Sequence, residues 1–125
     1  MEVIRLERKE VFILGYFDKN IIKIKPEEII YIAIAKRGSN IWANEEVWKH
    51  SDNRTFKSYK KVKELFEILK NHDFIYAHNS YIVNLKYIRR ITTDELEMMD
   101  GTRLSISRAR FKELKESFIK KYKFK

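Results

Sequence analysis

The longest apolar stretch of the chain, IIYIAIA at residues 29–35, limits the fold more than any other segment. It is rich in isoleucine, and an apolar run without polar alternation is typical of a buried strand. The run follows the only proline, Pro26, and ends at KRGSN, residues 36–40, where Gly38 and Asn40 favour a tight loop. It is much shorter than the roughly 20 residues that a membrane helix needs. The segment therefore predicts a buried strand followed by a tight loop.

Short β-branched and aromatic runs separated by polar breaks fill most of the first half of the chain. EVFILGYF and NIIKIK flank a turn predicted at residues 18–20, and IWANEEVW resumes the extended character after the tight loop. A further turn is predicted at residues 49–54, KHSDNR. FIYA and YIVN, on either side of residues 78–80, return to strand. These patterns predict mostly strands.

Two segments have helical periodicity instead. In SYKKVKELFEILK, Val62, Leu65, Phe66 and Leu69 fall on one face of a short amphipathic helix, and Ser58 is placed to cap its start. This helix is expected to pack on the sheets. A second helix closes the chain. Its apolar face consists of Phe111, Leu114, Phe118, Ile119 and Tyr122.

The segment LEMMDGTRLSI, residues 96–106, predicts a hairpin with a defined register. A two-residue turn at Asp100 and Gly101 would mix apolar and charged residues on both faces. A three-residue loop at residues 99–101, with Gly101 in the left-handed conformation, places apolar and charged residues on opposite faces of the hairpin. The expected pairs are Leu96 with Leu104 and Met98 with Thr102 on the apolar face, and Glu97 with Arg103 on the other.

The net charge of the chain indicates the class of partner. Lys and Arg number 27 against 18 Asp and Glu, so the formal net charge is +9 in 125 residues. Such an excess favours polyanions, with nucleic acid the first candidate and a membrane surface the second. The excess is spread along the chain, so a basic surface must be assembled by folding. The length suits a single domain over residues 1–125.

The cellular setting follows from what the sequence lacks. It has no cysteine, which excludes disulfides and thiolate chemistry and favours the reducing cytosol. The opening MEVIRLERKE is too charged for the apolar region of a secretory signal. We expect a soluble, cytoplasmic protein without a membrane segment.

The sequence also lacks the usual catalytic assemblies. It has no glycine-rich phosphate loop, and His50, His72 and His78 lie too far apart to suggest a metal site. We therefore expect no cofactor, no metal and no enzymatic activity. One alternative stays open, a small hydrolase that uses His78 and Ser80, although no carboxylate adjoins this pair.

The polar tripeptide HNS, residues 78–80, separates two apolar strands and has two interpretations. It can be a simple bend, because Asn and Ser hydrogen-bond their own backbone. It can also be a reading loop on a basic scaffold, because Asn binds adenine through two hydrogen bonds, and His or Ser can meet base edges or phosphates. Both interpretations stay open on the tripeptide alone.

Two longer segments resemble the signature of the LytTR family of bacterial DNA-binding domains. They are FIYAHNSYIVNLKYIRRI, residues 74–91, and LEMMDGTRLSISRARFKELK, residues 96–115. The shared pattern is an aromatic residue, His, a small polar pair, YIVN and YI, then a hairpin with a turn glycine and ISR opening a last segment. IIKIKPEEIIYI and SYKKVKELFEIL are similar to the family's entry strands and helix. The resemblance covers about residues 10–120.

The resemblance implies a mainly β fold, an elongated sandwich of small antiparallel sheets with one short amphipathic helix and a C-terminal helix. It also implies sequence-specific binding of duplex DNA by loops that enter successive major grooves, in a bacterial transcriptional regulator. Many such domains follow the receiver domain of a two-component response regulator. This chain has no room for a receiver domain, so we expect a stand-alone regulator or the C-terminal part of a longer one.

Carried over residue by residue, the resemblance places DNA contacts in four segments. Asn79 is the expected base reader, and Lys86 is a phosphate contact. The full set is Arg37, Ser39 and Asn40 before IWAN, His78, Asn79 and Ser80 in HNS, Lys86 after YIVN, and Arg108 and Arg110 in SISRAR.

The expected partner is double-stranded DNA with repeated half-sites, bound by a homodimer or by tandem copies. An RNA-binding module is the alternative, because exposed aromatic and basic side chains can also stack on and hold single strands.

Overall fold

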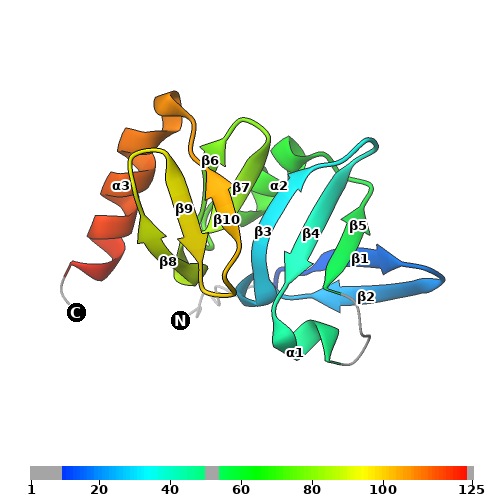
Figure 1. Ribbon diagram of the computed structural model, residues 1–125. Coiled ribbons are helices and arrows are strands. Elements are labelled where there is room, and N and C mark those ends of the chain that lie inside the picture. Colours follow the sequence, from blue (N-terminus) through cyan, green and yellow to red (C-terminus); the bar gives the residue numbers. More distant parts are fainter. Residues whose placement is uncertain (1–9, 50–53, 124–125) are drawn as a thin grey trace, which may run out of the picture.

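The computed structural model describes residues 10–49 and 54–123, which form two antiparallel sheets and short helices (Figure 1). The seven-stranded sheet has the order β2-β1-β5-β4-β3-β7-β6 and the three-stranded sheet the order β10-β9-β8. The strands of the larger sheet are β1 (Ile13–Phe17), β2 (Asn20–Ile24), β3 (Ile29–Ile34), β4 (Ser39–Ala43), β5 (Thr55–Ser58), β6 (Phe74–His78) and β7 (Tyr81–Asn84). Those of the smaller sheet are β8 (Ile88–Ile91), β9 (Glu95–Met98) and β10 (Arg103–Ser105). The helices are α1 (Glu45–Trp48), α2 (Val62–Leu69) and α3 (Arg108–Tyr122), with 3₁₀ turns η1 (Pro26–Glu28) and η2 (Leu85–Tyr87).

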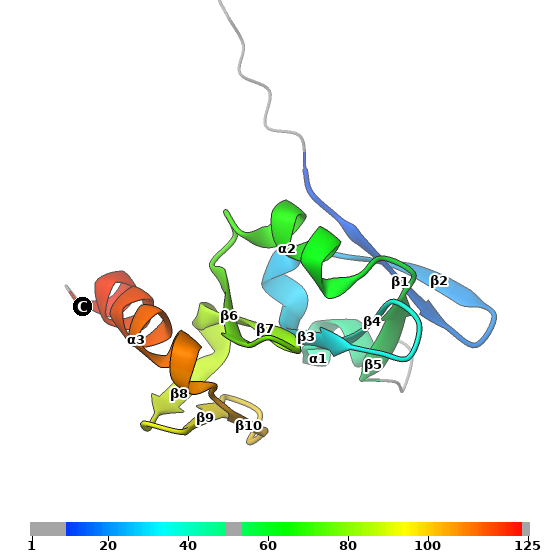
Figure 2. The same cartoon turned by 90° about the horizontal axis from the view of Figure 1, so that it is seen from above.

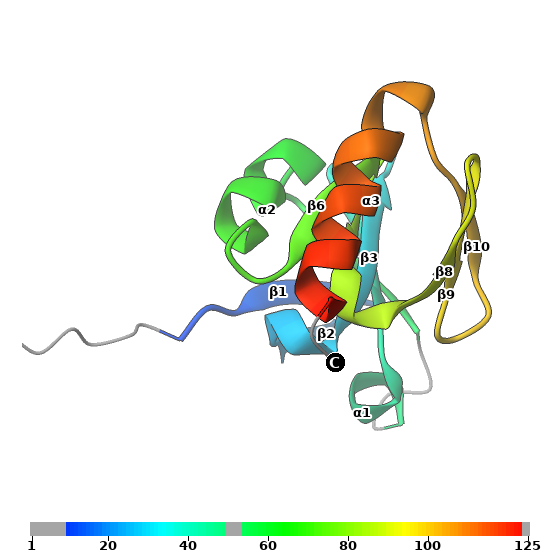
Figure 3. The ribbon, with the colours of Figure 1, turned by 90° about the vertical axis from the view of Figure 1, so that its left-hand side faces the viewer.

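Strand β3 is covered on both faces. Helix α2 lies over one face of the larger sheet, and the three-stranded sheet lies over the other (Figures 2 and 3). Ile29 and Ile32 belong to the core under α2, together with Leu65, whereas Ile30 and Tyr31 belong to the core that faces the smaller sheet. The predicted buried strand is confirmed. Its unbroken apolar sequence reflects burial from two sides.

Helix α3 lies beside β6 and closes the space between the two sheets (Figure 3). Leu114 is fully buried there, in the same core as Ala77 of β6 and Leu96 of β9. Ile119 was predicted to share this face, but it is 48% exposed. That prediction was wrong because the buried stripe of α3 is narrow, and residue 119 lies about 100° around the helix from Phe118.

The β9–β10 hairpin has the predicted register. Leu96 pairs with Leu104 and Glu97 with Arg103. Gly101 has a positive φ of 92°, as the three-residue loop requires. The hairpin is therefore specified locally, by the alternation of apolar residues and the position of one glycine.

The mainly β fold with short helices and a C-terminal helix is confirmed, although one sheet is larger than expected. The segment Glu45–Trp48, predicted as strand, forms α1 instead, because two glutamates in its first turn favour a helix start. The predicted cap of α2 was also wrong. Ser58 ends β5, and α2 begins after Lys61, whose amide donates to the carboxylate of Glu64 at 3.0 Å.

The turn predicted at residues 49–54 falls largely outside the described residues. In the described part of the chain, no helix is long and apolar enough to cross a membrane.

Candidate nucleic-acid interface

Three segments that are distant in sequence meet at the upper end of the molecule in Figure 1. They are the β3–β4 loop at residues 35–38, the β6–β7 turn at residues 79–80, and the start of α3 at Arg108. The Ile34 amide donates to the Ser80 carbonyl at 2.8 Å, and the Ser107 amide donates to the Ala77 carbonyl at 2.9 Å. These bonds hold the β6–β7 turn between its two neighbours. We call the three segments the loop end.

The HNS tripeptide forms the β6–β7 turn. A register shift between Tyr76 and His78 disturbs β6 just before the turn, and His78 Nδ1 accepts a hydrogen bond from the Ser80 amide at 3.1 Å. The His78 ring also stacks on Tyr81, with the ring centroids 5.2 Å apart. Asn79 is exposed, whereas His78 and Ser80 are half-buried. The predicted bend is present, and it exposes Asn79.

Arg110 of α3 reaches across to this turn. Its Nε and Nη2 donate to Asn79 Oδ1 at 3.3 and 3.1 Å. Its guanidinium carbon lies 4.7 Å from the centroid of the Tyr76 ring. Two side chains that are 31 positions apart in sequence thus form one unit of the surface.

A cleft of about 320 Å³ opens beside Asn79, between the β3–β4 loop and the start of α2. Its charged lining residues are Lys36, Lys61 and Lys63, and Tyr76 contributes an aromatic ring. The three lysines are exposed, and none of them forms an ion pair within the described residues. We call this the basic cleft. Unpaired lysines around a cleft raise the local concentration of polyanions.

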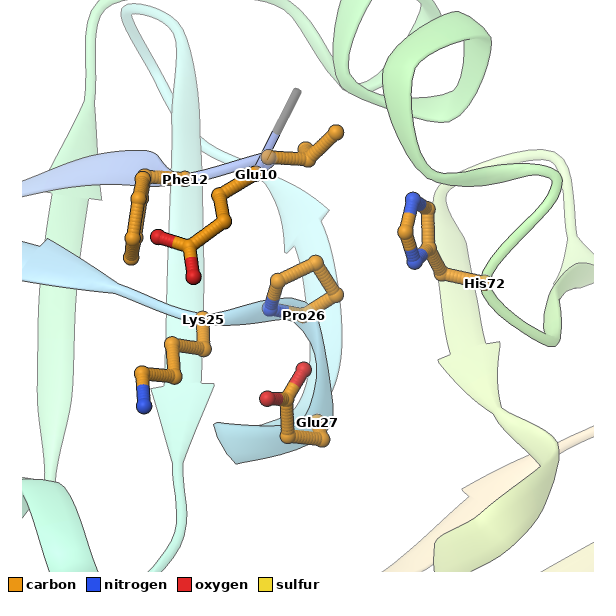
Figure 4. A pocket seen from close by; sticks show the side chains of 7 residues that line it. Glu10, Phe12, Lys25, Pro26, Glu27 and His72 are labelled. Atoms are coloured by element: carbon orange, nitrogen blue, oxygen red, sulfur yellow. The ribbon is translucent and has the colours of Figure 1, made fainter. Parts of the chain in front are cut away.

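Two of the pockets away from the loop end share the acidic side chain of Glu27. The pocket in Figure 4, of about 260 Å³, is lined by Glu10, Glu27 and His72. A pocket of about 240 Å³ is lined by Glu27, Asp73 and Lys86. Carboxylates make both unfavourable for a polyanion. No group of three His, Asp or Glu side chains that could hold a metal ion occurs in residues 10–49 or 54–123.

The structure brings together most of the residues predicted to contact DNA. Asn40 is half-buried within β4, two residues beyond the loop end. Ser39 is fully buried, and its Oγ donates to the Lys60 carbonyl at 2.7 Å. The tight loop predicted at residues 36–40 therefore ends before Ser39, which begins β4. The predicted DNA-contacting residues that lie at the loop end or immediately beside it are Arg37, His78, Asn79, Ser80, Arg108 and Arg110.

Lys86 lies apart from this group. It belongs to η2, which follows the end of β7 opposite the HNS turn (Figure 1). The three lysines of the basic cleft were not among the DNA contacts predicted from the sequence. A signal was present in YKKVK, where lysines cluster at a helix start, and in Lys36, which precedes Arg37. That Lys36, Lys61 and Lys63 face one cleft depends on the fold.

Tyr81 connects the β6–β7 hairpin to the smaller sheet. Its hydroxyl donates to the Ser105 carbonyl. Burial raises the pKa of Tyr81, and the side chain of Ser105 acts in the opposite direction with a smaller effect. Burial, followed by the charge of Asp100, raises the pKa of Tyr31 to about 12. Both phenols are protonated at neutral pH, and the stability they contribute is lost only as the pH rises through these elevated values.

Replacing Gly38 with alanine is expected to lower the free energy of unfolding by about 1 to 3 kcal/mol. Gly38 has a φ of +74°, and a Cβ there would overlap the Ser58 carbonyl oxygen. Backbone atoms cannot move aside as a flexible side chain can, so the β3–β4 loop must shift away from β5. Chemical denaturation of the variant and the wild type measures the loss.

Gly101→Ala is the matched control. Gly101 also has a positive φ, but a Cβ there would meet nothing within 4 Å. The free energy of unfolding of this variant should therefore fall only by the cost of a positive φ for alanine, roughly 1 kcal/mol. A Gly38 variant no less stable than the Gly101 variant would refute the steric argument.

Comparison with known proteins identifies the family and supports the fold. The family model of the LytTr DNA-binding domain matches residues 19–119. Among solved structures, the chain is similar to a LytTr DNA-binding domain from Bacillus cereus, whose parent protein is described as a methyl-accepting/DNA response regulator. The TM-score is 0.73 at 21% sequence identity, and the alignment covers 88% of this chain and 97% of that one. At this identity the likeness shows the fold. A search of curated proteins finds no match.

Proposed function

This chain belongs to the LytTR family of DNA-binding domains, and from that premise we propose that it binds specific duplex DNA sites as a bacterial transcriptional regulator. The observation that carries the proposal is the position of exposed Asn79, between the basic cleft on one side and the arginines of α3 on the other. Phosphate contacts by such basic groups supply affinity, and polar contacts to base edges supply specificity.

The residues divide into two roles. Lys36, Lys61 and Lys63 contact phosphates, because they are exposed, flexible and unpaired in the described part of the chain. Asn79 meets a base edge from the β6–β7 turn, and Arg37 and Arg108 do so from the flanking segments. Since the three segments project from one end of the molecule, they can enter successive major grooves.

We leave Lys86 outside this surface because η2 lies at the far end of β7. We treat residues 1–125 as one domain, since α3, β6 and β9 share a core. We further propose repeated half-sites, bound by a homodimer or by tandem copies. The description of the Bacillus cereus relative supports a place in a response regulator.

One exposed aromatic side chain favours RNA as the second candidate. Tyr59 is 76% exposed, and its ring centroid lies 4.7 Å from that of Tyr16, beside Lys60. A base could stack on such a ring. The hydrolase alternative has less support, because His78 Nδ1 is bonded to the Ser80 amide and not to its hydroxyl.

Selection from random duplex DNA at a fixed salt concentration tests the proposal. We expect an enriched motif that occurs as repeated half-sites, and we expect single-stranded RNA of equal length to compete poorly for the protein. Recovery of no motif, together with stronger competition by RNA than by duplex DNA, would reject DNA recognition in favour of the second candidate.

Asn79→Ala is expected to weaken binding to the selected site by about 1 to 3 kcal/mol while sparing most of the binding to random duplexes. The amide contacts a base edge, whereas the lysines that supply the nonspecific affinity are unchanged. Titrations with both kinds of duplex at one salt concentration measure the two losses.

Asn71→Ala is a suitable control, because Asn71 is exposed but lies in the acidic pocket beside Asp73. It should leave both affinities unchanged. Equal losses on specific and random duplexes for Asn79→Ala would argue against a base-reading role.

A further inference from the structure

The contact between Arg110 and Asn79 determines how the Asn79 amide can hydrogen-bond. A guanidinium group has donors and no acceptor, so the amide atom that faces it must be the oxygen. An amide oxygen has two lone pairs, and the Nε and Nη2 of Arg110 approach it at 3.3 and 3.1 Å. The acceptor capacity of Asn79 is therefore occupied within the protein. Its Nδ2 keeps two hydrogens to donate to a ligand.

Arg110 is itself held in place by its surroundings. Its guanidinium group lies over the Tyr76 ring, at 4.7 Å from the centroid, and the Tyr76 ring packs on Phe66 of α2 with centroids 4.7 Å apart. One helical turn further along α3, Leu114 is fully buried in the core. Arg110 forms no ion pair within the described residues, so no carboxylate competes with Asn79 for it.

This orientation conflicts with the usual way in which asparagine reads DNA. An asparagine that binds adenine uses its oxygen to accept from N6 and its nitrogen to donate to N7. With Oδ1 bonded to Arg110, only the second of these bonds can form. Guanine instead presents two neighbouring acceptors, N7 and O6, to the major groove. The donor-only amide of Asn79 is thus complementary to guanine.

We propose that Arg110 is a specificity-determining residue that orients Asn79 as a donor, so that Asn79 selects a G·C pair in place of A·T. The inference rests on the proposed function, in which Asn79 meets a base edge. Arg110 acts through Asn79 and is a positioning residue.

The test compares motifs selected from random duplex DNA by the full chain and by three variants. Asn79→Ala identifies the base pair that Asn79 reads, as the position at which preference is lost. In the wild type, we expect G·C at this position, favoured over A·T by about tenfold. Arg110→Met keeps an unbranched apolar stem over Tyr76 but removes the donors. It should reduce that preference to less than about threefold, because the amide is free to turn.

Arg108→Met is the matched control, since Arg108 precedes Arg110 in α3 and its replacement removes the same charge. It should lower affinity yet leave the preference at the Asn79 position intact. A structural defect would reduce preference at every position, whereas the proposed role changes one. In wild-type titrations, 7-deazaguanine at that position should weaken binding about fivefold by removing one acceptor, and this measurement does not depend on the folding of any variant.

The outcomes separate the inference from the proposed function. If the wild-type protein selects no motif, the proposed function fails and the inference fails with it. If a motif appears with A·T at the Asn79 position, or if Arg110→Met leaves the preference there unchanged, the inference alone is overturned.

Discussion

The triple variant Lys36→Gln, Lys61→Gln and Lys63→Gln is expected to bind duplex DNA of any sequence about 500-fold more weakly at about 0.1 M salt. Each phosphate contact contributes about −0.9 to the slope of log affinity against log salt concentration. Losing three contacts therefore reduces the magnitude of that slope by about 2.7. The three lysines surround one cleft and have no carboxylate partner in the described part of the chain. Anisotropy titrations at several salt concentrations give both the affinity and the slope.

A second triple variant separates local contacts from net charge. Lys19, Lys25 and Lys86 are also exposed, but they lie on the β1–β2 turn, before η1 and in η2. Replacing them by glutamine removes the same charge away from the basic cleft. We expect less than about a tenfold loss, because charges more than a Debye length from the DNA are screened. Equal losses for the two variants would show that general charge, and not the cleft, determines the affinity.

Leu114→Ala is expected to lower the free energy of unfolding by about 2 to 5 kcal/mol, through lost apolar burial and the cavity that remains. Leu114 has no exposed surface and belongs to the core shared by β6, β9 and α3. The same helix carries Arg108 and Arg110, so its loosening should also weaken DNA binding. Chemical denaturation measures the stability, and titration of the folded variant measures the affinity.

Ile119→Ala provides the comparison on the same helix. Ile119 is 48% exposed, so its truncation should cost only about 0.5 kcal/mol. If Ile119→Ala were as damaging as Leu114→Ala, the packing of α3 described above would be incorrect.

Local sequence patterns predicted several elements correctly because their signals lie within a few residues. The register of the β9–β10 hairpin follows from apolar alternation around one glycine. The buried strand β3 follows from an unbroken apolar run. The apolar face of α2 follows from helical spacing, and its Val62, Leu65 and Leu69 are buried.

The incorrect predictions concern short elements and boundaries. Helix α1 has only four residues and follows β4 closely. Its Val47 and Trp48 are typical of strands, so the sequence pattern extended the predicted strand past the end of β4. Serine is common in loops, but β4 pairs with β3 and β5 from Ser39 onward. This pairing buries the Ser39 side chain. At Ser39, pairing across the sheet overrode local preference.

By itself, the sequence determined the type and order of most elements, the register of one hairpin, and the family to which the HNS motif points. It also predicted a bend at HNS, and the family resemblance named Asn79 as the expected base reader. The tertiary structure alone decided that Arg110 occupies the oxygen of Asn79, that lysines from two separate segments surround the neighbouring cleft, and that Lys86 lies at the opposite end of β7. The physical reason is that periodicity records which face of an element is buried. The neighbours of an exposed side chain depend instead on how distant elements pack together.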